Sequence, residues 1–166
     1  MSDRQSAARD VVFKTLLFYI PVEVIFWMII PLLIGHNGVN EFINMGIAGL
    51  IGGLILAFMN VQLTFKRFLN PDSDTKTILK EEIRKHQLYG VIRAFRTKSI
   101  LLTTITSIVV FGPLPVYVLM ILNPYTMLIS ALCMGAAGAI SSWLNADYVT
   151  RKLIIPLAKE LNLSNE

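Results

Sequence analysis

The chain has 166 residues, of which 54% are apolar and only 16% charged, and its formal net charge is +4. A mean hydropathy of +0.61 excludes an ordinary soluble domain and an intrinsically disordered chain. The positive charge by itself is compatible with nucleic-acid binding. The positions of the basic residues, described below, favour a membrane protein instead.

The apolar residues form four stretches, each close to the roughly 20 residues that cross a hydrocarbon layer about 30 Å thick. They cover residues 11–34, 42–65, 99–122 and 126–148. The sequence therefore predicts an all-α integral membrane four-helix bundle. Its predicted parts are an N-terminal tail (1–10), a first transmembrane hairpin (11–65), a basic amphipathic connection (66–98), a second transmembrane hairpin (99–148) and a C-terminal tail (149–166).

All 15 Lys and Arg residues lie in three places: three near the N-terminus, nine between residues 66 and 98, and three after the last span. Basic segments are retained on the cytoplasmic side during membrane insertion. Both termini and the central connection are therefore predicted to be cytoplasmic, and a bacterial plasma membrane is the predicted location. We predict a lipid bilayer, and possible association with another membrane protein or a second copy, as partners, and no nucleic acid.

Glu23 lies at the midpoint of the first span, where a charged carboxyl is disfavoured by roughly 2.5 kcal/mol or more on insertion scales. It should face the bundle, be protonated or have a polar partner. Tyr19 and Trp27 lie one turn to either side on the same face of the helix. Two interpretations stay open: Glu23 and Tyr19 form a proton or ion site in a transport path, or a neutral acid joins the helices through hydrogen bonds.

Small residues recur every four positions along the second and fourth spans, a spacing that lets helix backbones approach closely. These residues are Gly49, Gly53, Gly135, Ala139, Gly138 and Ser142. We predict that the two spans pack on each other within one chain. Contact between two chains is the alternative.

The connection at 66–98 is predicted to contain two short amphipathic helices broken around Gly90, because the apolar positions change face between residues 86 and 90. Oxygens at 72–74 are suited to cap the first of these helices. The helices are expected on the membrane surface or under the bundle, near lipid headgroups or a docked cytoplasmic partner. The side chains predicted to contact headgroups are Lys80, Arg84, Lys85, Arg93 and Arg96.

The third span contains Gly112, Pro113 and Pro115, which should kink or interrupt it. The backbone carbonyls freed there must find partners within the protein. Four hydroxyl residues between 103 and 107 can donate to carbonyls of the preceding turn, so they do not by themselves indicate a polar path.

Polar residues also occur near the cytoplasmic ends of the spans. Asp147 precedes Arg151 by four residues, which predicts a local ion pair. Asn60, Gln62 and Asn145 lie at a similar depth. These three either form a polar vestibule or are ordinary boundary residues.

The two halves of the chain resemble each other. Residues 45–51 (MGIAGLI) match residues 134–140 (MGAAGAI) at five of seven positions. A basic pair followed by a proline comes after both spans, at 66–71 and at 151–156. The halves are either duplicated hairpins related by an axis along the membrane normal or alike by chance.

The sequence contains no catalytic motif, no cofactor-binding motif and no cluster of metal ligands, so we predict no catalytic, cofactor or metal site. The leading hypothesis is a small multi-pass membrane protein that is not an enzyme and acts by association, as an accessory, assembly, regulatory or immunity-type protein. The alternative is a small oligomeric proton- or cation-coupled transporter or channel that uses Glu23.

Overall fold

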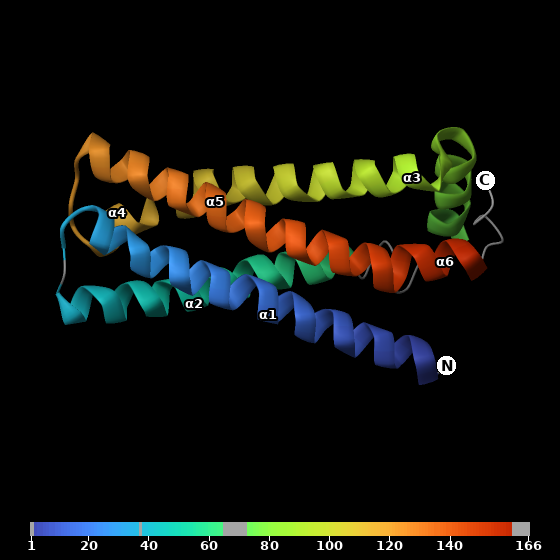
Figure 1. The fold of residues 1–166 in the computed structure, drawn as a ribbon, viewed down its shortest axis with the longest axis horizontal. Helices are drawn as coiled ribbons and strands as arrows, with labels where there is room; N and C mark the ends of the chain where they lie inside the picture. Colours follow the sequence, from blue (N-terminus) through green and yellow to red (C-terminus); the bar gives the residue numbers. More distant parts are fainter. Residues whose placement is uncertain (1, 37, 65–72, 161–166) are drawn as a thin grey trace.

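The computed structural model describes residues 2–36, 38–64 and 73–160, and every element in these ranges is helical. Long helices lie side by side, and one end of the molecule is closed by a shorter transverse segment (Figure 1). The elements, with η marking a π-helical turn, are α1 (Ser2–Leu33), α2 (Val39–Thr64), α3 (Ser73–Thr106), η2 (Ser107–Phe111), α4 (Leu114–Val118), α5 (Pro124–Val149), η3 (Thr150–Ile154) and α6 (Ile155–Glu160).

Four segments are long and apolar enough to cross a membrane. They are Arg9–Leu33, Val39–Thr64, Thr77–Val118 and Pro124–Glu160. Large apolar side chains such as Phe13, Leu101 and Leu132 are exposed on their outer faces, where lipid tails would surround them. The predicted all-α bundle with four spanning helices is confirmed.

The long helices pack in the order α2, α1, α5, α3, because α1 contacts both α2 and α5 while α3 contacts α5. The prediction that the second and fourth spans pack on each other is therefore wrong. The small residues of each span contact the other helix of the same hairpin instead. A small-residue spacing identifies a face of a helix that admits a close neighbour, but it does not identify the neighbour.

In the first hairpin, glycines of α2 lie against the backbone of α1. A Cβ added at Gly49 would be 2.9 Å from the Cα of Val24, and one added at Gly53 would be 2.8 Å from the Cα of Ile20. Real Cβ atoms do not approach other atoms so closely. The two helices can therefore keep this separation only while both positions are glycine.

The second hairpin repeats this arrangement with α5 facing the third span. A Cβ added at Gly135 would be 2.9 Å from the side chain of Ile108, and Gly138 lies against Ser107. Ser142 is buried with its hydroxyl oxygen 3.2 Å from that of Ser99, while Ala139 is half-buried. In both halves the repeated segment thus contacts the first helix of its own hairpin. Common descent of the hairpins stays a prediction.

The third span and the segment before it are one helical element with a sharp bend. The backbone leaves the helical conformation at Gln87 (φ 58°, ψ 159°), and the helix then continues through Gly90, where the break was expected. The segment before the bend lies across the end of the bundle (Figure 1). The predicted capping oxygens at 72–74 and the motif at 66–71 lie outside the described side chains.

This transverse segment, residues 77–86, forms with η3 and α6 what we call the cap. Its apolar side chains join those at the ends of α1 and α5 in one buried cluster. The members of the cluster are Val11, Leu79, Ile83, Val91, Val149, Leu153, Ile154, Leu157 and Ala158. Of the two expected locations for the amphipathic segment, the structure shows the one beneath the bundle.

The third span is interrupted near its far end, as Gly112, Pro113 and Pro115 predict. The π-helical turn η2 is followed by the short helix α4. The hydroxyl of Ser130, on α5, donates a hydrogen bond to the carbonyl oxygen of Gly112. A backbone carbonyl at the interruption therefore has a partner inside the protein, which is the condition for such a break within a membrane.

Candidate functional site

One face of α1 is buried along the whole bundle and carries most of the candidate site. Its residues recur at steps of four, which places them in one row on the helix. The row runs through Val11, Thr15, Tyr19, Glu23 and Trp27. Four polar or amphipathic side chains, from Thr15 to Trp27, thus follow one another toward the middle of the molecule.

Glu23 is completely buried, with an exposed fraction of 0%. Neither of its carboxyl oxygens has a hydrogen-bond partner among the described residues. The indole N–H of Trp27 is the polar group that interacts with this carboxyl, but it does not reach hydrogen-bond geometry. The hypothesis that Glu23 joins the helices through hydrogen bonds therefore lacks an observed bond.

The hydroxyl group of Tyr19, on α1, lies near polar side chains from each of the other three spans. Thr103 of α3, Ser142 of α5 and Asn60 of α2 are the polar side chains around it. The hydroxyl itself is buried and makes no hydrogen bond that meets normal geometry. It therefore has neighbours that can accept or donate a hydrogen bond, and it is bonded to none of them.

More hydroxyl and amide groups lie in the same interior. The Thr15 hydroxyl is 2.8 Å from the amide oxygen of Asn145, which joins α1 to α5. The hydroxyls of Ser107 and Ser141 are buried and have no partner among the described residues. Asn60 and Asn145 are also buried whereas Gln62 is exposed, so two of the three residues of the predicted vestibule face the interior.

Sequence reasoning missed the contribution of the third span. Ser99, Thr103 and Ser107 are spaced by four, like Tyr19 and Glu23 on the first span, and this periodicity was the available signal. Hydroxyls in helices commonly bond to the preceding turn, so their presence alone does not indicate a polar interior. In the structure Thr103 and Ser107 are buried and face the other helices.

Apolar packing closes the interior beyond Trp27. The ring of Phe111 and the indole nitrogen of Trp27 both lie close to Gly52, at 3.5 and 3.7 Å from where its Cβ would be. Met45 and Met134 are fully buried in the same cluster. Tyr19, Glu23 and the polar side chains around them therefore lie on the cap side of this apolar cluster, while Ser130 is buried further along, at the interruption of the third span.

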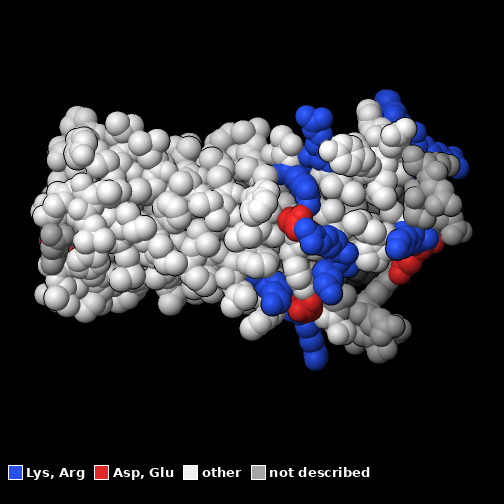
Figure 2. Space-filling view, in the orientation of Figure 1, with Lys and Arg blue, Asp and Glu red and all other residues white. Residues whose placement is uncertain are grey.

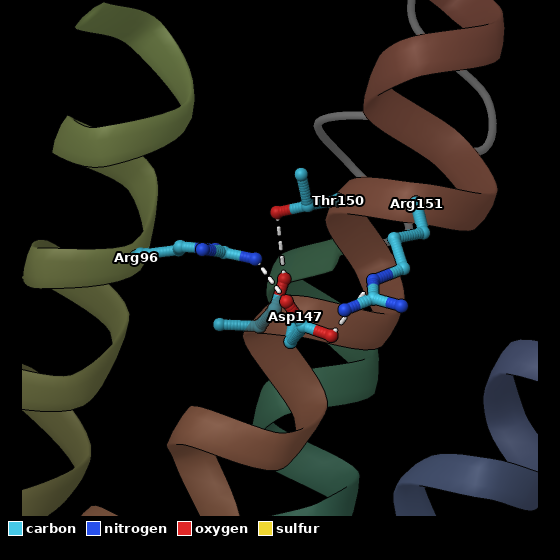
Figure 3. Close-up of polar contacts among 5 residues, drawn as sticks. Arg96, Asp147, Thr150 and Arg151 are labelled. Atoms are coloured by element: carbon cyan, nitrogen blue, oxygen red, sulfur yellow. Dashed lines mark hydrogen bonds and ion pairs between the residues drawn. The ribbon is translucent and has the colours of Figure 1, made fainter. Parts of the chain in front are cut away.

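An ion-pair network lies where the bundle meets the cap. Asp147 pairs with Arg96 of α3 and, at 2.9 Å, with Arg151 one turn further along (Figure 3). The predicted pair with Arg151 is confirmed. Arg96 has a protein partner in Asp147, and its contact with lipid headgroups stays a prediction. Thr150 donates to the carbonyl of Ala146 at 2.7 Å.

Replacing Asp147 by alanine is expected to lower the free energy of unfolding by about 1–3 kcal/mol, because Arg96 then loses its carboxylate while its Nε is already buried and unpartnered. Arg151→Ala should cost less than about 1 kcal/mol, since that side chain is 73% exposed. Denaturant unfolding in detergent compares the two variants. Equal losses would show that the Arg96 pair contributes nothing.

The other residues predicted to contact lipid headgroups lie at the surface. Lys80, Arg84, Lys85 and Arg93 are exposed. Lys and Arg gather around one end of the molecule, and the rest of the visible surface is almost free of charge (Figure 2). Their contact with headgroups stays a prediction.

Within the described ranges, no three His, Cys, Asp or Glu side chains come together in a way that could hold a metal ion. No protein-family model matches the chain, and comparisons with curated proteins and with solved structures find no similar protein. The site must therefore be interpreted from its own chemistry.

Proposed function

We propose that this protein binds and releases a proton at Glu23 within the membrane, as part of a proton-coupled transporter or channel. The observation that supports the proposal is the unpartnered, fully buried carboxyl of Glu23. An ionisable residue at this depth is costly, and such residues commonly mark proton or ion pathways. The carboxyl is enclosed by one chain, so the site itself needs no second copy.

A proton fits this site better than a metal cation. Hard cations take about six or more oxygen ligands, and the polar groups that surround Tyr19 and Glu23 are mainly hydroxyls and an amide. Protonation removes the charge of Glu23 and with it the cost of burial. The protonated acid is therefore the stable form in the closed bundle, and release requires water.

Association with another membrane protein is the second candidate function. It was predicted partly from the small-residue faces, and Gly49, Gly53, Gly135 and Gly138 are occupied by contacts inside the chain. The remaining support is the cap, where an open cavity of about 470 Å³ borders His86, Gly90 and Lys98. A partner would have to bind mainly at this end.

We also propose that the basic end of the bundle is cytoplasmic and that the membrane is a bacterial plasma membrane. The gathering of Lys and Arg around one end supports this orientation, because positively charged segments resist translocation (Figure 2). Labelling of a cysteine at position 80 from outside intact cells would contradict it.

Proton flux into proteoliposomes tests the function. Under an imposed membrane potential, a pH-sensitive dye inside the vesicles should report acidification with the wild-type protein and none above the protein-free rate with Glu23→Gln. Glu41→Gln is the matched control, because Glu41 lies half-buried at the opposite end of the bundle, where its carboxyl contacts His36 and Gly38. Undiminished flux in a folded Glu23→Gln protein would remove Glu23 from the mechanism.

A further inference from the structure

A cavity of about 140 Å³ lies between α2 and the third span on the cap side of the bundle. It is bordered by Asn60 and Thr64 of α2 and by Lys98, Ser99 and Thr103 of α3. The helices α2 and α3 stand at the two ends of the packing order α2, α1, α5, α3. Because they do not pack along each other, space is left between them. Leu63, Phe95 and Leu102 make most of its wall apolar, and the five polar residues supply groups that can bind water in a space of this volume.

The cavity is lined by both exposed and buried residues. Lys98 is exposed, whereas Asn60 and Thr103 are 7% and 4% exposed. These same two buried residues are neighbours of the Tyr19 hydroxyl. Tyr19 in turn lies one helical turn from Glu23 on the buried face of α1.

We propose that this cavity is the route by which a proton from water at the basic end reaches Glu23, with Tyr19 as the relay. A hydronium ion in the cavity gives its proton to the phenolic oxygen of Tyr19, and the original phenolic proton passes to the Glu23 carboxylate. Water is left in the cavity, Tyr19 is unchanged and Glu23 becomes neutral. The inference rests on the proposed function of Glu23.

The packing beyond Glu23 makes this route one-sided. On the far side of Glu23, Trp27 and Phe111 belong to a cluster of buried apolar side chains that also contains Met45 and Met134. Glu23 therefore exchanges protons with the basic end in this conformation. Release to the opposite side requires the segment around Phe111 to move.

Cysteine accessibility tests the route without measuring transport. In a Cys133→Ala background, Thr103→Cys should react with 2-aminoethyl methanethiosulfonate in proteoliposomes. Ala137→Cys should not react, because Ala137 is equally buried and does not border the cavity. Failure of a folded Thr103→Cys protein to react would overturn the route, even if Glu23-dependent flux is observed.

Tyr19→Phe tests the relay, because it keeps the ring and removes only the hydroxyl. Flux is expected to fall at least about tenfold, whereas Tyr117→Phe, at an exposed tyrosine, should leave it unchanged. Unchanged flux in Tyr19→Phe would exclude the relay. Absence of flux in the wild type would reject the proposed function, while the reaction at Thr103→Cys would still report whether the cavity is hydrated.

Discussion

Gly53→Ala is expected to lower the free energy of unfolding by about 2 kcal/mol or more. The added methyl group would lie 2.8 Å from the Cα of Ile20 and 3.2 Å from the carbonyl oxygen of Tyr19. Both atoms belong to the backbone of α1, so no side chain can rotate away and the two helices must separate. Overpacking of this kind typically costs about 1–3 kcal/mol, and loss of close contacts along α1 and α2 adds to it.

Gly46→Ala is the matched control on the same helix. Its added methyl group would lie 3.6 Å from the sulfur of Met28, an ordinary contact with a flexible side chain. Unfolding in mixed detergent micelles can be followed by the fluorescence of Trp27, which is 1% exposed, in a Trp143→Phe background. Equal stabilities of the two variants would refute the close approach of α1 and α2 at Gly53.

Ile83→Ala is expected to destabilise the cap by about 2–5 kcal/mol, the usual range for truncating a buried isoleucine. Ile83 is 0% exposed and belongs to the cluster that fastens residues 77–86 to η3 and α6. Its loss leaves a cavity in the cluster that joins the cap to the ends of α1 and α5. The cap should then open more often than the membrane bundle.

Trypsin cleavage in detergent measures that opening, because Arg84 and Lys85 lie in the cap helix and are cut only when it unfolds locally. Cleavage there should be at least tenfold faster in Ile83→Ala than in the wild type. Ile78→Ala, at a position 55% exposed on the same segment, should leave the rate nearly unchanged. Equal rates in the two variants would mean that Ile83 does not hold the cap.

The four spanning helices could be predicted because each needs only length and hydropathy. The buried face of α1 could also be predicted, since a charged residue at Glu23 has to avoid lipid and fixes which side of the helix turns inward. The helices that pack against the small-residue faces could not be predicted from the sequence. Gly49 and Gly138 would suit contact with any helix, and the choice depends on how all four spans fit together.

The bend was predicted around Gly90 because the apolar positions change face between residues 86 and 90, and the helix breaks at Gln87, inside that stretch. The residue at which it breaks depends on how the apolar face of the cap packs on the bundle. The same limitation applies to the site: spacing along one helix indicated Tyr19 and Glu23, but the approach of Asn60 and Thr103 depends on the other helices.

The order of the helices in the bundle has a consequence for biogenesis. The first hairpin has its own close contacts at Gly49 and Gly53, so it can pair before the second hairpin leaves the ribosome. At that stage α5 has not yet packed against α1, the helix that carries Glu23. A polypeptide halted at that stage exposes an acidic group to lipid, which is a feature that membrane quality control can use to distinguish unfinished chains from complete ones.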